Sequence, residues 1–514
     1  FHMIHTTIPG ELDVMGVSLL TGAFVIIGFN ADVAWTHTIS TAQRYTLYEL
    51  ELDPDDPMRY RYGDGYRSIE AATVTVGGEP RRVYFSHYGP LLANAGLPWT
   101  RETAYAVRLA AFAGDEAIAS SLDTYEKLHR ASSVGDVERA ISLGGSWLTN
   151  TVAADRHGNA FYADISAAPN VDDGLLVRCR RAVPGLPPAT VVLDGSRPDC
   201  EWQDDDRSVV PGNLPPAAMP RATSRDYFTN SNDSYWLSNP DTPLEGYPQI
   251  IGPERTARSL RTRAGLQYLG EVIADDGKVT PDELQQIIFS HRHFGAELLA
   301  DDVLKLCADG PDTIADSCAT LADWDRSART DSRGTQLWTE FWEVARQLDG
   351  LYREPFDAER PVDTPRGLDV EDPAVRAGLV SALESAAERL AEASVPADAA
   401  WGQVQFADRN GERIPVPGAR GWHGVFSYID ARLNPGVGYT PIRSGNSYIQ
   451  VVSWTDDGAL DARGILAYSQ SPEPESPHYA DQTRLYSRGE WIDLPFTAAD
   501  ISSDPNLRIV TIRE

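Results

Sequence analysis

The order of segment types along the chain constrains its fold more than any other feature of the sequence. Residues 1–110 are rich in strand patterns, and the run 46–52 alternates apolar and polar residues before a Pro- and Asp-rich stop. Residues 255–350 show mostly helical spacing, whereas the C-terminal part returns to strands such as 447–452. Strands, then helices, then strands predict one α+β assembly with a mostly helical insertion at about 255–400.

Shorter patterns predict individual elements within this plan. Two β-hairpins are predicted, one at 72–85 around Gly77-Gly78 and one at 151–163 around Gly158. Thr280 to Glu283 form a capping box with Pro at the first helical position. The remaining segments are predicted as a helical region at 115–143, a Pro-rich surface segment at 181–220, a connector at 353–373 and an Ala-rich helix at 374–396.

Composition narrows the classes of function. The chain has 514 residues, of which 42% are hydrophobic, enough for a substantial core. Its formal net charge of -30 disfavours nucleic-acid binding, which needs positive charge to displace phosphate counterions. No apolar run reaches the 18 residues of a membrane span, so no membrane partner is expected.

Four cysteines allow three disulfide pairings or four free thiols. We favour Cys179–Cys200 and Cys307–Cys318, because each pair brackets a polar loop that contains Pro or Asp. Disulfides are typical of proteins outside the cytosol, so this pairing predicts a secreted or periplasmic protein.

Three patterns suggest chemistry without deciding it. No Gly-x-Ser-x-Gly elbow is present, and the nearest runs, 144–147 and 444–447, resemble strand entries. His291 and His293 could bind a metal, but no third ligand follows nearby and the segment is interpreted as helical and structural. The polar run Asn230–Ser234 fits either an Asx-rich turn or an amide donor directed at an oxyanion.

Ordered motifs along the whole chain resemble the penicillin-acylase family. They are Ile8-Pro9-Gly10, Ile27-Gly28-Phe29-Asn30, Ala34-Trp35-Thr36-His37-Thr38, Ser86-His87-Tyr88-Gly89-Pro90, residues 155–162, residues 230–240, and the C-terminal run 468–483. The C-terminal run and the cysteine spacing are closest to the branch of aculeacin A acylase and acyl-homoserine-lactone acylase.

The resemblance implies an N-terminal-nucleophile hydrolase with an αββα four-layer sandwich. In that family a precursor cleaves itself into a small α-subunit and a large β-subunit, and this chain, residues 1–514, resembles the β-subunit. An N-terminal serine attacks the amide carbonyl and its own α-amine is the base. That serine is expected upstream of Phe1. The implied enzyme is an amidohydrolase acting on linear amides, with a small-molecule acyl-amide substrate and no cofactor.

The resemblance also assigns site residues. The oxyanion donors map to the backbone N–H of Ile39 and the side chain of Asn232, with Asn230 as the fallback. The apolar acyl pocket maps to Phe24, Tyr125 and Trp147, with Thr21 and Gly22 at its mouth. Related penicillin G acylases bind calcium through Asp residues after the oxyanion strand. Here that stretch, 42–45, has no carboxylate, so no metal site is expected.

Three functions remain in competition. The first is hydrolysis of fatty-acyl amides, either of a lipopeptide such as aculeacin or of an N-acyl-homoserine lactone. The second is a penicillin V acylase. The third, from a different class, is a non-catalytic ligand-binding subunit, since the nucleophile is not part of this chain.

Overall fold

The computed structural model describes residues 1–511 except 20–21, 23, 94–96, 111–114 and 147. Trp147 and Thr21, both predicted to contact the acyl group, therefore lie outside the described residues. The chain forms two compact units: unit 1 comprises Phe1–Ala34 and Arg255–Glu514, and unit 2 comprises Trp35–Glu254.

Unit 2 contains a six-stranded sheet with the order β14-β5-β11-β10-β9-β8. β14 runs parallel to β5 and the other neighbours are antiparallel. Its strands are β5 (Tyr45–Glu51), β8 (Glu70–Val76), β9 (Glu79–Ser86), β10 (Gly89–Leu92), β11 (Thr103–Leu109) and β14 (Val192–Asp194). The predicted hairpin at 72–85 is confirmed as β8 and β9, which pair from Val76 and Glu79 outward.

Part of the prediction for the Pro-rich segment 181–220 is wrong. It does not only follow the surface, because its residues Val192–Asp194 form β14, which is buried beside β5. The local sequence Val191-Val192-Leu193 is apolar and contains two β-branched valines, so it can pair with the open edge of β5. A small hairpin, β6 (Arg59–Tyr62) with β7 (Gly65–Ser68), and the helix α3 (Asp173–Cys179) complete this part of the unit.

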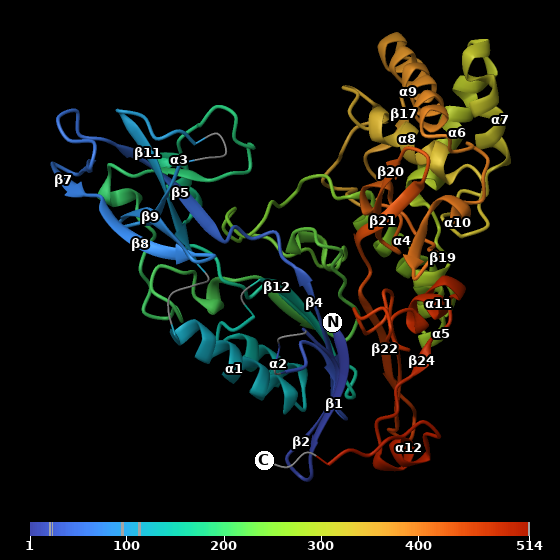
Figure 1. Cartoon of the computed structure of the whole chain (residues 1–514), viewed down its shortest axis with the longest axis horizontal. Helices are drawn as coiled ribbons and strands as arrows, with labels where there is room; N and C mark the ends of the chain where they lie inside the picture. The colour runs from blue at the N-terminus through green and yellow to red at the C-terminus, as the bar shows by residue number, and fades with distance from the viewer. Residues whose placement is uncertain (20–21, 23, 94–96, 111–114, 147, 512–514) are drawn as a thin grey trace. The chain divides into compact units, whose positions relative to one another are not determined.

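A second group of strands in unit 2 carries the candidate site. β4 (Val33–Ile39) neighbours β12 (Thr149–Asp155), which pairs with β13 (Ala160–Ala163) and then β15 (Arg221–Ser224). The predicted hairpin at 151–163 is thus confirmed, and Asp155 holds its turn by accepting backbone N–H groups of His157 and Asn159. β4 and β12 are labelled in Figure 1.

The helical region predicted at 115–143 consists of two helices, α1 (Asp115–His129) and α2 (Val134–Ile141). Ser133 separates them because its extended backbone and its side chain, which accepts the N–H of Asp136, cap the start of α2. Asp155 also accepts the N–H of Val134 at 3.1 Å, which fixes this helix start to the end of β12.

Unit 1 begins with an antiparallel meander and continues into helices. The strands are β1 (His2–Ile8), β2 (Leu12–Ser18) and β3 (Ile27–Phe29). The helices are α4 (Leu260–Asp276), α5 (Pro281–Phe289), α6 (Phe294–Ala308), α7 (Ala315–Asp323), α8 (Thr335–Ala345) and α9 (Pro373–Glu392). The predicted helical character of 255–350, the capping box at Thr280 and the helix at 374–396 are all confirmed.

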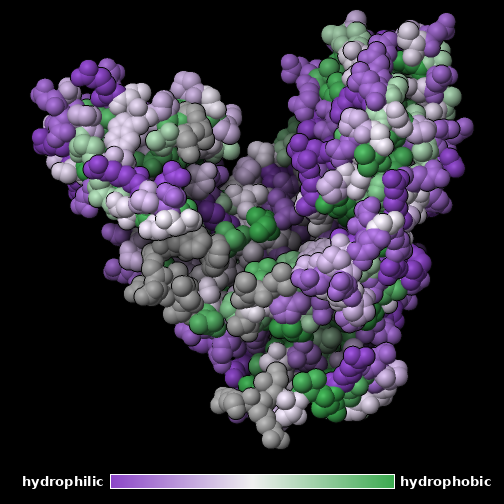
Figure 2. Space-filling view, in the orientation of Figure 1, coloured by the Kyte–Doolittle hydropathy of each residue, from purple (hydrophilic) through white to green (hydrophobic). Residues whose placement is uncertain are grey.

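Helix α8 contributes three large aromatic residues to the unit 1 core. Trp338, Phe341 and Trp342 on this helix are almost completely buried, and they pack within one cluster with residues of α6 and α9. Figure 1 shows α6, α7, α8 and α9 together, and Figure 2 shows that their visible outer face is mainly hydrophilic. A hydrophilic outer face is expected for a chain with 75 acidic and 45 basic residues.

Short strands and helices complete unit 1. They are β16 (Tyr352–Glu354), β17 (Arg366–Leu368), α10 (Trp401–Val404), β18 (Phe406–Arg409), β19 (Glu412–Pro415), β20 (Ile429–Asn434), β21 (Gly438–Gly445), β22 (Tyr448–Trp454), β23 (Leu460–Leu466), α11 (Asp481–Arg488), β24 (Ile492–Asp493) and α12 (Ala498–Ser503). The strand predicted at 447–452 is confirmed as β22. The predicted connector 353–373 contains one strand and part of another, since β16 and β17 pair there.

Both predicted disulfides are present. Cys179 at the end of α3 is bonded to Cys200, and Cys307 of α6 is bonded to Cys318 of α7. Each bond closes a loop that the chain would otherwise leave free in the unfolded state, which is the usual source of disulfide stabilisation. None of the helices in the described part of the chain has the length and apolar character of a membrane-spanning segment.

Candidate functional site

The end of β4 and the loop at 230–234 meet in unit 2. The amide of Asn232 donates a hydrogen bond to the backbone carbonyl of Ile39 at 3.2 Å. Both residues are exposed, and Asn232 has a φ of 64°, a left-handed conformation that Asn tolerates better than most residues. The two residues that the resemblance assigned as oxyanion donors, Ile39 and Asn232, are therefore neighbours, although 193 positions separate them.

Asn230 fixes this loop to the strands. Its side-chain oxygen accepts hydrogen bonds from the N–H of Asn232 at 2.9 Å, the hydroxyl of Thr38 at 2.7 Å and the amide of Asn150 at 3.3 Å. Its own amide donates to the carbonyl of Asp233 at 3.0 Å. Asn230 holds the loop through both its oxygen and its amide, and the exposed amide at the surface belongs to Asn232.

Asn150 and Tyr162 extend the network beneath the loop. The amide of Asn150 donates to the hydroxyl of Thr38 at 3.1 Å, and the hydroxyl of Tyr162 donates to the oxygen of Asn150 at 2.7 Å. Asn150 and Tyr162 are completely buried. Neither Asn150 nor Tyr162 is among the site residues predicted from the sequence. The signal that could have indicated Asn150 is its place within a strand that begins a predicted hairpin. A polar side chain buried at such a position needs hydrogen-bond partners.

His37 lies two residues before Ile39 on strand β4. Its Nδ1 is 3.1 Å from the hydroxyl of Thr151, and the ring packs edge-on against Tyr125 at 6.1 Å between centroids. Burial lowers the pKa of His37 to about 4, despite an opposing backbone hydrogen bond from Asn150. The imidazole next to the site is therefore neutral at neutral pH, and its Nε2 has no protein partner among the described residues.

The predicted acyl-pocket residues are distributed over both units. Tyr125 of unit 2 is buried on α1, and burial raises the pKa of its hydroxyl to about 12. Phe24 and Gly22 belong to unit 1 and are half-buried. A Cβ on Gly22 would lie 2.7 Å from the Ser18 hydroxyl, so a larger residue there would have to displace that hydroxyl. The acyl-contact role of all these residues stays a prediction.

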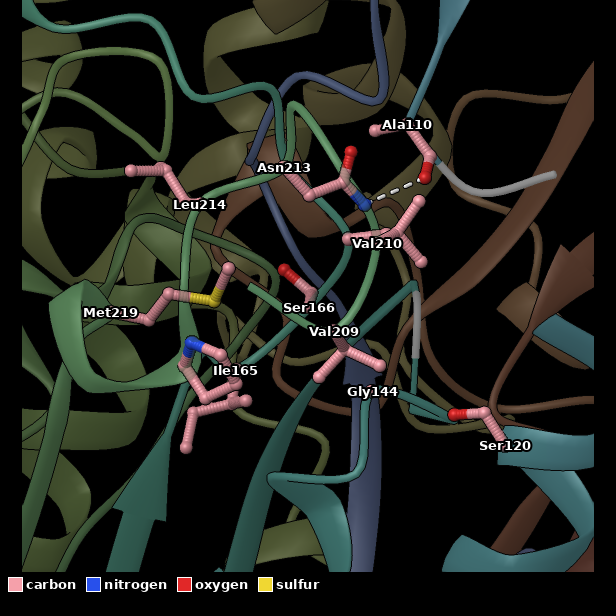
Figure 3. Close-up of a pocket in the computed structure, with 12 residues that line it drawn as sticks. Ala110, Ser120, Gly144, Ile165, Ser166, Val209, Val210, Asn213, Leu214 and Met219 are labelled. Carbon is pink, nitrogen blue, oxygen red and sulfur yellow. Dashed lines mark hydrogen bonds between the residues drawn. The ribbon is translucent and has the colours of Figure 1, made fainter. Parts of the chain in front are cut away.

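A small cavity in unit 2 is too small to hold an acyl chain. It has a volume of about 40 Å³, enough for roughly one or two water molecules. Figure 3 shows Asn213 at this cavity, with its amide donating to the carbonyl of Ala110 at 2.8 Å. The Oδ1 of Asn213 is buried without a protein partner among the described residues, which is the kind of group that an ordered water satisfies.

The residues His291, Arg292 and His293 have structural contacts. The prediction that they are helical is wrong, because they link α5 to α6 and form bridges to Ser327 and Val425. The side chain of His293 caps α6, while Arg292 pairs with Glu271 and Glu297. Across the described residues, no group of three or more His, Cys, Asp and Glu is arranged to hold a metal ion. The expected absence of a calcium site stays a prediction.

The family model described as penicillin amidase matches residues 1–503. The chain belongs to the penicillin amidase family. Aculeacin-A acylase of Actinoplanes utahensis is 38% identical over 543 residues, covering 100% of this chain and 66% of that protein. Acyl-homoserine lactone acylase PvdQ of Pseudomonas fluorescens is 34% identical over 530 residues, covering 100% of this chain and 67% of that protein. The chain thus spans about two thirds of the length of these relatives. Membership of the penicillin amidase family, with relatives named as acylases, indicates an amidohydrolase.

A solved member of the penicillin amidase family confirms the fold. The thermostable penicillin G acylase from Alcaligenes faecalis superposes with a TM-score of 0.63 at 17% identity, covering 100% of this chain and 94% of that one. The predicted α+β N-terminal-nucleophile hydrolase fold is therefore correct. At this identity the likeness shows the fold alone.

Proposed function

We propose that this chain is the large subunit of an enzyme that hydrolyses the amide bond of fatty-acyl amides. The observation that supports the proposal most directly is the 3.2 Å contact between Asn232 and Ile39, since it brings two candidate oxyanion donors to one point on the surface of unit 2. The fatty-acyl preference rests on the relatives, which are named as acylases of aculeacin A and of acyl-homoserine lactones.

The proposed reaction uses an N-terminal serine contributed by the precursor segment before this chain. The serine hydroxyl attacks the amide carbonyl, the amine departs, and water hydrolyses the resulting acyl-enzyme. The negative charge on the carbonyl oxygen is held by the N–H of Ile39 and the amide of Asn232, which turns from the Ile39 carbonyl toward the oxyanion. Because Asn230 fixes the loop, only the side chain of Asn232 has to turn when the charge develops.

The proposal includes a partner and a location. A small α-subunit from the same precursor completes the heterodimer after self-cleavage, and the enzyme acts outside the cytosol, where its two disulfides persist.

The test is Asn232→Ala in the assembled enzyme. We expect kcat to fall by roughly 10²- to 10³-fold, the usual cost of losing one oxyanion donor, with little change in the melting temperature. Asn410→Ala is the matched control, because Asn410 also has a positive φ and donates its amide to a backbone carbonyl, that of Pro474. If Asn232→Ala retains full activity, the assignment of the donor is wrong.

Two further measurements separate the competing functions. A serine-directed acylating inhibitor should add to the N-terminal serine in intact mass, and the absence of an adduct would favour a non-catalytic binding subunit. A panel of C4 to C16 acyl amides beside penicillin V should show kcat/KM rising roughly fourfold per methylene while the pocket has room. A preference for penicillin V would replace the fatty-acyl assignment.

A further inference from the structure

Unit 1 contains a cavity whose lining residues, between 407 and 483, are distant in sequence from Ile39 and Asn232. It has a volume of about 380 Å³, within the roughly 300–1,000 Å³ typical of small-molecule sites. The cavity is formed by β18, the segment after β19, the hairpin of β20 and β21, the link to β22, the segment after β23, and the start of α11, several of which are labelled in Figure 1. All of its lining residues belong to unit 1.

One side of this cavity is apolar. Five aliphatic residues line it, namely Ala407, Val416, Ile429, Ile442 and Ala467. They all belong to a hydrophobic cluster that also contains Ile465 and Tyr486, so the wall is backed by packed core. A wall of this kind favours a ligand with an aliphatic portion, at about 0.8 kcal/mol per CH₂ removed from water.

The other side of the cavity is rich in hydrogen-bond donors. Arg409, Arg443 and Asn446 line it. The Nε of Arg409 is buried without a protein partner among the described residues, while another nitrogen of its guanidinium donates to the carbonyl of Tyr468 at 3.4 Å and the Asn446 amide faces the hydroxyl of Tyr486. Arg443 is exposed, and no ion pair joins it to a carboxylate in the described part of the chain. A buried donor without an acceptor costs free energy of folding. A ligand that carries an acceptor, such as a carboxylate, would remove this cost.

The charge at the cavity contrasts with that of the whole chain. The chain carries 75 acidic and 45 basic residues, yet two arginines and no Asp or Glu line this cavity. A concave surface of one charge sign beside low-dielectric walls concentrates the field on a ligand of the opposite sign. An anion is therefore favoured here, although the protein as a whole repels anions.

We propose that this cavity binds a carboxylate with a short aliphatic chain. The planar carboxylate would accept hydrogen bonds from Arg443, Arg409 and Asn446, since guanidinium and carboxylate match in bidentate geometry. The chain would lie against Ile429 and Ile442. This binding site is separate from the proposed oxyanion donors, and the proposal stands whether or not the chain is part of an acylase.

The test measures octanoate binding to the assembled protein by calorimetry, beside octanol and octyltrimethylammonium. We expect Arg443→Gln to weaken octanoate binding at this site by roughly tenfold to a hundredfold, because a charge-assisted hydrogen bond is lost. Arg432→Gln is the matched control, since Arg432 is an exposed arginine on the same hairpin that does not line the cavity. Octanol binding as tight as octanoate, or equal binding by both variants, would overturn the proposal.

Crystals of the assembled protein soaked with 8-bromooctanoate locate the site independently. A bromine anomalous peak in this cavity, lost in Arg443→Gln crystals, supports the proposal and separates this site from any acyl pocket elsewhere. A cavity that is empty, or that is filled by polypeptide from outside residues 1–514, contradicts it. Amide hydrolysis measured on Arg443→Gln should equal that of the unmodified enzyme, so failure of this proposal and failure of the proposed function give different results.

Discussion

Unit 2 and unit 1 each contain a buried polar network, and the two differ in charge. The network of unit 2 joins Thr38, Asn150 and Asn230 through hydroxyl and amide groups that are all neutral. The network of unit 1 is centred on Glu343, whose carboxylate accepts hydrogen bonds from Arg420, Trp422 and His423 at 2.6 to 2.8 Å.

The difference in charge has a physical consequence. A neutral network keeps its hydrogen bonds over a wide pH range and leaves its site without a competing charge, which suits donors that must receive a developing oxyanion. In unit 1, burial alone would raise the pKa of Glu343, but hydrogen bonds from His423, Trp422 and Arg420 hold it well below its usual range. The ionic network therefore contributes to stability and makes that stability dependent on pH.

Glu343→Ala tests the ionic network and should have the largest effect. Removing the carboxylate leaves the buried Arg420 charge with fewer partners, and we expect a loss of about 3–5 kcal/mol in the free energy of unfolding. Urea denaturation at pH 7 measures it. Glu392→Ala is the control, because Glu392 is exposed at the end of α9. A loss below about 1 kcal/mol would mean that the network is not a stabilising element.

The pH dependence of unit 1 should follow its buried histidines. Burial lowers the pKa of His291 to about 4, with a further contribution from Arg329, so the unfolded chain binds a proton near pH 6.5 that the folded chain does not. Protonation of His291 should therefore lower stability by about 2–3 kcal/mol between pH 7 and pH 4.5. His423 and His293 are also held at lowered pKa, mainly by burial.

His291→Asn isolates this contribution, because His291 has a φ of 49° that Asn tolerates. The variant should lose stability at pH 7 but show a shallower decline toward pH 4.5 in urea denaturation. An unchanged slope would assign the pH dependence to other groups.

Asn230→Ala tests the neutral network. It removes the acceptor of three donors, and we expect a loss of about 1–3 kcal/mol in stability together with a lower kcat, because the Asn232 loop is no longer fixed. Thermal unfolding and hydrolysis are measured on the same samples. Asn506→Ala, at an exposed position, is the control. An unchanged kcat together with reduced stability would show that Asn230 stabilises the loop but does not influence catalysis.

Thr38→Val should have the smallest effect. It replaces the hydroxyl by a methyl group of similar size and removes two hydrogen bonds, one donated to Asn230 and one accepted from Asn150, while the Asn150 to Asn230 bond remains. We expect a loss of about 1 kcal/mol by denaturation. Thr73→Val on the exposed strand β8 is the control and should change stability by less. A loss above about 3 kcal/mol would show that the neutral network acts as a single unit.

Local sequence patterns predicted the elements that depend on near neighbours. The hairpin around Gly158, the capping box at Thr280 and the pairing of Cys179 with Cys200 all followed from short-range turn, cap and loop chemistry. The predictions were wrong where a partner distant in sequence determines the structure of a segment. Val192–Asp194 was read as part of a surface segment because its strand partner, β5, lies more than a hundred positions earlier.

The candidate site shows the same division between sequence and tertiary structure. Motif order by itself determined the family, the fold class and the assignment of Ile39 and Asn232 as the residues to examine. Only the tertiary structure decided that Asn230 holds the loop while Asn232 presents its amide, and that Asn150 and Tyr162 support them. The physical reason is that the bonds from Thr38 and Asn150 to Asn230, from Tyr162 to Asn150 and from Asn232 to Ile39 join positions 12 to 193 residues apart. No local propensity encodes such distances, and they arise when packing brings the strands together.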